Sequence, residues 1–169
     1  MKLDVSIPAG VDDGMQVRLS GEGQPSPDGG PAGDCYCFIA LRKHPLFERN
    51  GSDLHVQIPV AFTQAALGAK IEIPTLNGPD ELELPAGTQS GEVFRLVRKG
   101  MPDPRSGRVG NLLVRVYVEV PKTLAPKQEE LLRALAAEED QNVSPHRQSF
   151  KEMLGKFFKG DKTEASSAG

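Results

Sequence analysis

The sequence has no tryptophan, only two cysteines and no long apolar run. A membrane-spanning helix needs ~18 consecutive apolar residues, and the first residues lack the pattern of a secretory signal. Two cysteines cannot form the disulfide framework of a secreted protein. The net charge of −3 gives no support for nucleic-acid binding, which usually requires a basic face. We therefore expect a protein of the cytoplasm that binds neither nucleic acid nor membranes.

Glycine and proline, by contrast, are abundant, with 18 and 14 residues. This density is typical of short strands joined by turns and argues against a helical bundle. Apolar residues make up 38% of the chain, which fits two thin cores better than one thick core. The composition therefore favours a mainly β protein.

One stretch of the chain occurs twice, with a constant offset of 77 residues. The first copy begins at Ile7-Pro8-Ala9-Gly10 and the second at Leu84-Pro85-Ala86-Gly87. Matched turn glycines between matched strands indicate that the same small β unit is built twice. The further matched positions are Gly14 and Gly91, Arg18-Leu19 and Arg95-Leu96, Gly23 and Gly100, and Gly33 and Gly110.

Alternation of apolar and polar residues predicts the strands, and helical spacing predicts one short helix before the second copy. The expected helix covers 61–69, with Thr63 as its cap and Gly68 at its end. On the strand before His44, the side chains of Cys35, Cys37, Ile39 and Leu41 share one face. The predicted strands are 2–7, 16–19, 34–42, 54–59, 70–74, 81–84 and 112–120.

The repeat also makes a prediction about the first copy. The second copy is preceded by a strand at 54–58, a helix at 61–69 and a strand at 70–73. Counterparts of these elements would lie before residue 1. We therefore expect the first β unit to be incomplete, with its remaining strands supplied by a longer polypeptide or by a partner.

The last third of the chain has helical periodicity. Pro126 suits the first turn of a helix, and Leu131, Leu132 and Leu135 form a narrow apolar stripe. After a polar linker, Ser149-Phe150-Lys151-Glu152 fits a capping box that opens an amphipathic tail helix. That helix would carry Phe150, Met153, Leu154, Phe157 and Phe158 on one face, and residues 161–169 look disordered.

Several motifs, in the right order, resemble the carboxy-terminal region of the DnaJ co-chaperones over about residues 2–135. Each motif alone would be weak, but their order makes the resemblance specific. They are Ile7-Pro8-Ala9-Gly10-Val11-x-x-Gly14, Gly33-Asp34, His44-Pro45-x-Phe47-x-Arg49, Ile73-Pro74-Thr75-Leu76-x-Gly78, Leu84-Pro85-x-Gly87-Thr88-Gln89-x-Gly91, Arg98-Lys99-Gly100 and Gly110-Asn111-Leu112.

The resemblance implies two tandem β-rich, sandwich-like domains followed by a dimerisation helix. On this basis residues 1–45 would be part of the first domain, residues 46–121 the second domain, and residues 122–140 the dimerisation helix. Residues 141–169 would hold the linker, the tail helix and a disordered end.

The resemblance also implies a binding role without catalysis: the chain would hold unfolded clients as a homodimer, and the full-length protein would deliver them to a DnaK-type chaperone. The sequence departs from full-length members in three respects. It has no His-Pro-Asp signature, no Gly/Phe linker and no repeated Cys-x-x-Cys-x-Gly-x-Gly. We therefore expect no ATPase stimulation by this chain and no cofactor, because zinc belongs to the absent cysteine-rich region.

Carried over from the family, the client pocket falls on Leu3 and Cys37, with Val5 and Ile39 beside them on the same faces. A free sheet edge next to such a pocket can hold an extended chain through its backbone, while the pocket selects a side chain. The alternative is that all four residues are ordinary core residues. The dimer contact is expected at Leu131, Leu132 and Leu135, unless this stripe packs on its own β domain.

Metal binding and catalysis have weaker support in the sequence. Cys35, Cys37 and His44 could be metal ligands, but Cys-x-Cys on a regular strand is not a typical zinc spacing. The carboxylate pairs Asp12-Asp13 and Glu81/Glu83 lie in a turn and on a solvated strand face. The remaining alternatives are an all-β structural or ligand-binding sandwich with an oligomerisation tail and, more distantly, a metalloenzyme.

Overall fold

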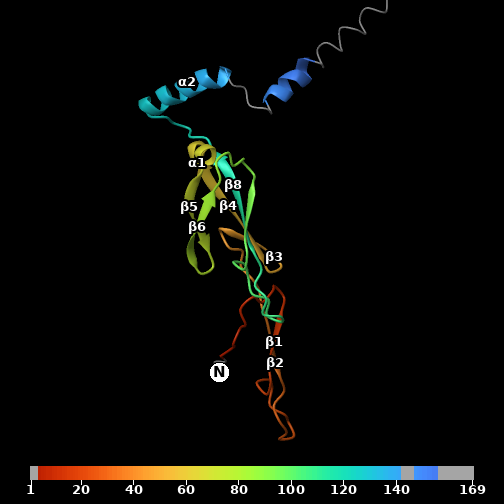
Figure 1. The fold of residues 1–169 in the computed structure, drawn as a ribbon. Helices are drawn as coiled ribbons and strands as arrows, with labels where there is room; N and C mark the ends of the chain where they lie inside the picture. The colour runs from red at the N-terminus through yellow and green to blue at the C-terminus, as the bar shows by residue number, and fades with distance from the viewer. Residues whose placement is uncertain (1–3, 142–146, 156–169) are drawn as a thin grey trace, which may run out of the picture. The chain divides into compact units, whose positions relative to one another are not determined.

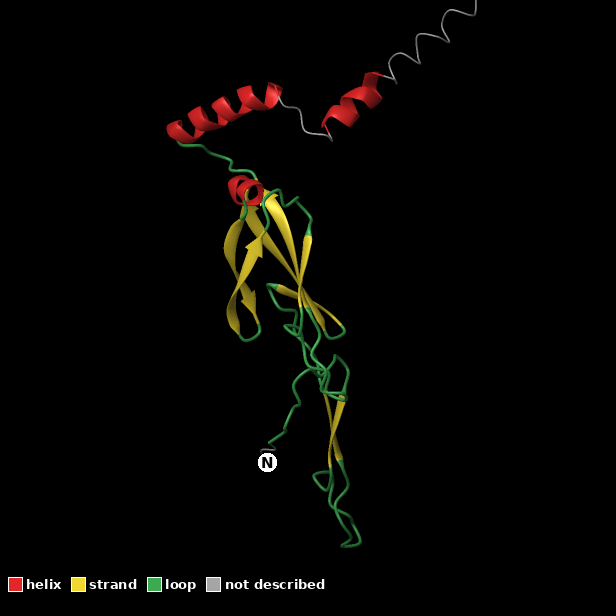
Figure 2. Cartoon of the chain, viewed as in Figure 1, coloured by secondary structure: helices red, strands yellow, loops and turns green. Residues whose placement is uncertain are grey.

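A computed structural model describes residues 4–141 and 147–155. The chain divides into two compact units, Met1–Val120 and Pro121–Gly169. The first unit is built of strands with one short helix, and the second is helical (Figures 1 and 2), which confirms the prediction of a mainly β fold followed by helices. No helix in the described part of the chain is long and apolar enough to cross a membrane.

A four-stranded sheet, in the order β3-β4-β8-β7, forms one layer of the first unit. Its central pair is parallel, running from Leu54 opposite Leu112 to Ala61 opposite Glu119. The hairpin of β5 and β6 forms a separate two-stranded sheet, seen beside β4 and β8 in Figure 1. The bounds are β3 (Phe47–Asn50), β4 (Asp53–Ala61), β5 (Ala69–Thr75), β6 (Gly78–Leu84), β7 (Val93–Leu96) and β8 (Leu112–Glu119).

The core lies between these two sheets because their strands alternate apolar and polar residues. Ile73 of β5 and Leu84 of β6 are buried against the central pair. Burial of each such aliphatic side chain stabilises the fold by ~1.5–3 kcal/mol. The core residues on β4 and β8 are Leu54, Val56, Val60, Leu112, Val114 and Val116.

Helix α1 (Phe62–Leu67) follows β4 and is shorter than predicted. Its N-cap is Ala61, whose N–H donates to Oε1 of Gln64 over 2.9 Å, so the prediction of Thr63 as the cap is wrong. The prediction that Gly68 ends the helix is confirmed, because Gly68 is the C-cap and has a φ of 80°. A glycine accepts this backbone conformation without a steric cost.

The repeat in the sequence is a repeat in the structure. β1 (Gln16–Leu19) pairs with β2 (Cys35–Phe38) in the register that β7 has on β8, so Val17 lies opposite Cys37 as Phe94 lies opposite Val114. The turns match as well. Gly23 N–H donates to Gly33 O over 2.7 Å, and Gly100 N–H donates to Gly110 O over 2.9 Å.

The observed strands differ from the predicted ones in several places. Residues 4–7, expected in a strand over 2–7, are not in one. Their counterpart in the second copy is the end of β6, which pairs with β5, and the described residues contain no counterpart of β5 for the first copy. β2 is shorter than the predicted 34–42, and β3 and β7 were not predicted.

In the second unit, α2 (Pro126–Gln141) covers the predicted helix. The N–H of Ala125 donates to Oε1 of Gln128 over 2.9 Å, which satisfies one of the free donors at the helix start. A further helix covers 147–155, so Ser149 lies inside it and not at its cap. Phe157, Phe158, residues 142–146 of the linker and the expected disordered end lie outside the described residues.

Candidate functional site

The inner face of the β1–β2 hairpin is apolar and only partly covered. Val17, Cys37 and Ile39 are each half-buried. The counterparts of Cys37 and Ile39 on β8 in the second copy, Val114 and Val116, are fully buried. The same apolar face is therefore closed in the second copy and partly open in the first.

The β5–β6 hairpin accounts for this difference. Leu84 at the end of β6 is 2% exposed because it packs against Val116. Ile7, the residue at the matching place in the first copy, is 57% exposed. The described part of the first copy has no second layer over Cys37 and Ile39, which leaves an apolar surface that can receive another side chain.

One edge of β2 is also open. The N–H of Ile39 donates to Met15 O over 2.9 Å, and Gly14 N–H donates to Ile39 O over 2.8 Å. The N–H and C=O groups of successive residues in a strand point to alternate edges. Those of Cys37 therefore face β1 as well, and those of Tyr36 and Phe38 face the opposite edge. In the described residues β2 pairs with β1 alone, whereas β8 pairs with β7 on one edge and β4 on the other.

The structure brings together part of the predicted pocket. Cys37 and Ile39 share the inner face, and Val5 is half-buried but lies outside any strand. Leu3 lies outside the described residues. The outer face of the same hairpin carries Tyr36 and Phe38, which are 52% and 70% exposed.

The two thiols add to the apolar character of this face. Desolvation, and secondarily the neighbouring Cys37 thiol, raise the pKa of the Cys35 thiol. A protonated thiol is a poor nucleophile and a poor metal ligand. In 4–141 and 147–155, no three His, Cys, Asp or Glu residues are grouped to hold a metal ion. His44, the third ligand considered, instead accepts hydrogen bonds through Nδ1 from the backbone of Leu46 and Phe47.

A joint between the two copies centres on Arg49 of β3, a residue that the sequence analysis named only as part of a family motif. Its Nη1 donates to Val11 O over 2.6 Å, and its Nη2 donates to Gly10 O over 2.8 Å. Nη2 also lies 2.6 Å from Asp12 Oδ1, and Nε donates to Gly51 O over 2.7 Å. The planar fork of a guanidinium suits donation to several acceptors at once, so Arg49 fastens the first copy to the second sheet.

Close packing completes this joint. Gly10 is buried with a φ of 85°, and a Cβ there would lie 1.7 Å from Pro102 O. Asp13 Oδ1 accepts a hydrogen bond from Leu41 N over 2.7 Å. Of the Asp12-Asp13 pair considered above, Asp12 is thus engaged with Arg49 in holding the two copies together, and Asp13 holds Leu41 within the first copy.

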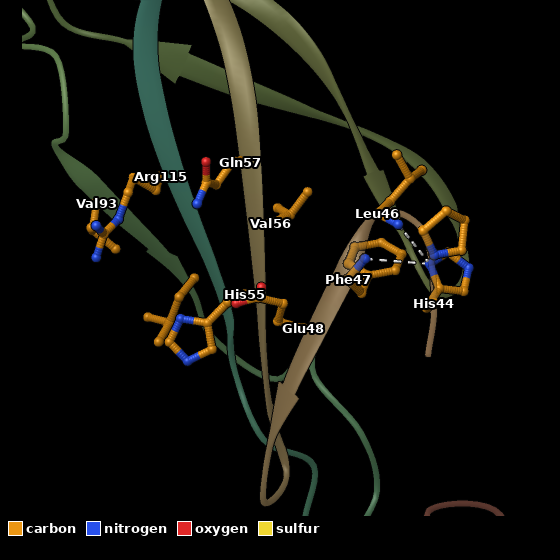
Figure 3. A pocket seen from close by; sticks show the side chains of 11 residues that line it. His44, Leu46, Phe47, Glu48, His55, Val56, Gln57, Val93 and Arg115 are labelled. Atoms are coloured by element: carbon orange, nitrogen blue, oxygen red, sulfur yellow. Dashed lines mark hydrogen bonds between the residues drawn. The ribbon is translucent and has the colours of Figure 1, made fainter. Parts of the chain in front are cut away.

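A second hollow, of about 730 Å³, lies at the second copy (Figure 3). Its lining includes His55 and Gln57 of β4 and Arg115 of β8, with Gln57 directly opposite Arg115. Exposed apolar residues, Leu46 and Val93, lie beside them. Mixed donors and small apolar surfaces give this hollow a more polar character than the inner face of the first copy.

The stripe on α2 is exposed. Leu131 is 59% exposed, and Leu132 and Leu135 are each 40% exposed. Phe150 and Met153 of the following helix are also more than half exposed. Nothing in the described part of the second unit covers these side chains.

The sequence of the chain matches those of known proteins. The family model described as DnaJ C terminal domain matches residues 1–121. The chain belongs to the DnaJ C-terminal domain family. The two-copy arrangement with an open first copy is therefore the form this DnaJ region takes here.

Curated relatives extend the likeness through the helices. The chaperone protein DnaJ of Rhodopirellula baltica is 56% identical over 166 residues, which is 98% of this chain and 42% of that protein. Those of Janthinobacterium sp. (strain Marseille) and Clostridioides difficile are 48% and 45% identical, over 92% and 93% of this chain. The chain spans about 42% of the length of the curated relatives it matches.

Proposed function

We propose that this chain is the client-binding part of a DnaJ co-chaperone and has no catalysis of its own. An unfolded client offers free backbone groups and scattered apolar side chains. The open edge of β2 would pair with the client backbone, and the face of Cys37 and Ile39 would seat its apolar side chains, with Leu3 and Val5 beside them. Main-chain bonds then give affinity and the apolar face gives selectivity.

One observation carries this proposal: the second copy fills the same edge with a strand of its own. There β4 lies parallel to β8, with Val56 opposite Val114. β2 repeats the β8 register with respect to its other neighbour, so its open edge has the geometry to accept a strand in the same way. The peptide Asp53–Ala61, the sequence of β4, is therefore a natural first probe.

We further propose that α2 joins two such chains through Leu131, Leu132 and Leu135. Two linked grooves would hold one unfolded chain more tightly than one groove, because the second contact becomes intramolecular. In the longer protein, working in the cytoplasm, delivery to a DnaK-type chaperone would follow.

The experiment uses fluorescence anisotropy of labelled peptides with the full chain. Cys37→Asp and Leu3→Asp would place an unpaired charge on the apolar face, which is strongly disfavoured, so we expect at least tenfold weaker binding. Gln16→Asp, on the exposed outer face of β1, is the matched control and should bind normally. Equal affinity of the Cys37→Asp variant and the parent would assign Cys37 to an ordinary core.

Backbone pairing has its own test. In a strand added to β2, every second N–H of the peptide faces β2. N-methylation of those alternate positions should abolish binding, whereas methylation of the other set should leave it within about twofold. Equal effects of the two methylation patterns would contradict strand addition. Reduced, unfolded protein should compete for the site, and the same protein in its native form should not.

A further inference from the structure

Another pocket, distinct from the hollow of Figure 3, lies at the joint between the two copies and has a volume of about 660 Å³. Its apolar lining comes from segments far apart in the sequence: Leu41 after β2, Leu76 at the β5–β6 turn, and Met101 after β7. Leu41 and Leu76 are 44% and 46% exposed. Phe47 and buried Leu54 complete the apolar lining. The pocket thus offers an apolar floor that remains open to solvent.

The rim of this pocket carries cations that the joint does not use. Arg42 and Lys43 are exposed, and neither forms an ion pair within the described ranges. Arg49 also lines the pocket, but its guanidinium is engaged by Asp12 and by backbone carbonyls. The lining also contains two carboxylates, Glu48 and Asp13, and Asp13 keeps its negative charge although it accepts the N–H of Leu41, so the rim carries charges of both signs.

His44 adds a donor to the same rim. Its Nδ1 accepts from Leu46 N over 3.1 Å and from Phe47 N over 3.3 Å, as the dashed lines in Figure 3 show. A ring whose Nδ1 accepts carries its proton on Nε2 when neutral, so Nε2 is a donor. The ring is held against Phe47, with 5.1 Å between the ring centroids.

We propose that this joint pocket is a second subsite for the client, and that it takes a bulky apolar side chain with a carboxylate beside it in the sequence. The apolar floor of Leu41, Leu76 and Met101 fits the side chain, and Arg42, Lys43 and His44 fit the carboxylate. This inference rests on the proposed function, because it extends the client groove along the chain.

Continuity with that groove identifies the occupant. Ile39 of the inner face is two residues before Leu41, so a client strand paired with the open edge of β2 would extend toward the pocket. The subsite would make the chain prefer clients in which an acidic residue follows an apolar one. Exposed ion pairs are weak, so we expect the two free cations together to give a preference of about three- to tenfold.

The test compares two labelled peptides by fluorescence anisotropy with the full chain. Both carry the β4 sequence Asp53–Ala61, followed by Phe-Glu-Glu in one peptide and by Phe-Lys-Lys in the other. The parent should bind the acidic peptide three- to tenfold more tightly at low salt, and the preference should shrink as salt is added.

Charge reversal at Arg42 and Lys43 (R42E/K43E) should remove or invert this preference while leaving the peptide core bound. The matched control is R95E/R115E, which makes the same charge change at two exposed positions on β7 and β8. Leu76→Ser should weaken both peptides, and Leu67→Ser, at a residue 79% exposed on α1, should weaken neither.

The outcomes separate the two proposals. Binding of both peptides without a preference, or a preference that survives R42E/K43E, overturns the joint subsite and leaves the β2 groove standing. Failure of the parent to bind either peptide overturns the groove and the subsite together. A loss of preference in the R95E/R115E control as well would assign the effect to overall charge and also overturns the subsite.

Discussion

Arg98 has a backbone φ of 60° at the position where Gly21, in the first copy, has a φ of 76°. The two turns are otherwise matched. Gly21 N–H donates to Asp34 Oδ1 over 3.1 Å, and Arg98 N–H reaches Asn111 Oδ1 over 3.4 Å. The second copy therefore forms the same turn with an arginine where the first copy has a glycine.

This relationship gives a stability prediction. A side chain in the left-handed region costs roughly 1–2 kcal/mol, whereas glycine costs about 0.5–1 kcal/mol through the entropy of the unfolded chain. Arg98→Gly should therefore raise the free energy of unfolding by about 0.5–1 kcal/mol, and Gly21→Arg should lower it. Urea denaturation measures both variants. A lower urea midpoint for Arg98→Gly would show that the arginine side chain contributes more than the strain.

Substitution of Arg49 at the joint should lower the free energy of unfolding by a larger amount. Arg49→Leu leaves the Gly10 and Val11 carbonyls and the Asp12 carboxylate without their donor. Hydrogen bonds to a charged group contribute about 1.5–3 kcal/mol, so we expect a loss of about 2–3 kcal/mol. Arg49→Lys should recover only part of it, because one ammonium cannot replace the fork. Limited proteolysis should cut the segment before Phe47 faster in the leucine variant; an unchanged cutting rate would argue against a fastening role.

Two aspartates with lowered pKa values should make the stability of the fold depend on pH. A hydrogen bond from Lys99, followed by one from the backbone N–H of Glu81, lowers the pKa of Asp80. Backbone N–H donors, first that of Ser106, lower the pKa of Asp103. A carboxylate with a lowered folded pKa contributes stability above its unfolded pKa of about 3.9 and loses it as the pH falls through the folded pKa.

Asp80→Asn and Asp103→Asn should therefore have lower urea midpoints than the parent at pH 7. The difference should narrow at pH 3 and below, where the parent carboxyls become protonated. A difference that is constant from pH 7 to pH 2 would mean that the substitutions act through something other than charge.

The exposed leucines of α2 predict the oligomeric state. Burial against a second copy would remove each leucine from water, at ~1.5–3 kcal/mol apiece, and association entropy offsets part of this gain. Replacing Leu131, Leu132 and Leu135 together by Ser should give folded monomers with weaker client capture. Light scattering of the parent at micromolar concentration checks the premise, and a monomeric parent would contradict it.

The sequence predicts that the chain does not stimulate the ATPase of a DnaK-type chaperone. Without a His-Pro-Asp signature in the sequence, the purified chain should leave the ATP turnover of a DnaK-type chaperone unchanged while weakly suppressing client aggregation. A steady-state ATPase assay with and without the chain measures this. Clear stimulation of ATP turnover would contradict the proposed function, because it would require a surface on this chain that acts on the ATPase.

Local rules predicted most of the second copy from the sequence. Alternation located β4, β5 and β6, and Gly68 marked the end of α1, because these elements are specified by residues within a few positions of each other. The offset of 77 residues gave the matched turns, which the structure confirms down to individual hydrogen bonds. Repetition was thus as informative as periodicity.

The failures arose where tertiary partners decide the structure. Residues 4–7 alternate correctly but have no neighbouring strand to pair with among the described residues, and alternation alone does not hold a strand. β3 was overlooked because Glu48, Arg49 and Asn50 are all polar and show no alternation, although Arg49 bonds to Gly10 and Val11, some 40 residues earlier in the chain. A similar separation in sequence explains why the joint pocket could not be predicted, because Leu41, Leu76 and Met101 come together only in the folded chain.

The central parallel pair has a consequence for how the chain is made. β4 and β8 are neighbours in the sheet, yet Asp53 and Asn111, which a hydrogen bond joins, lie 58 residues apart. Such distant pairing is slow to form, whereas the β5–β6 hairpin closes locally over its turn. On the ribosome, Leu54, Val56 and Val60 of β4 lack their parallel partner strand until Leu112–Glu119 has been synthesised. Until then, the nascent chain displays an alternating apolar strand of the kind that its finished form is proposed to bind.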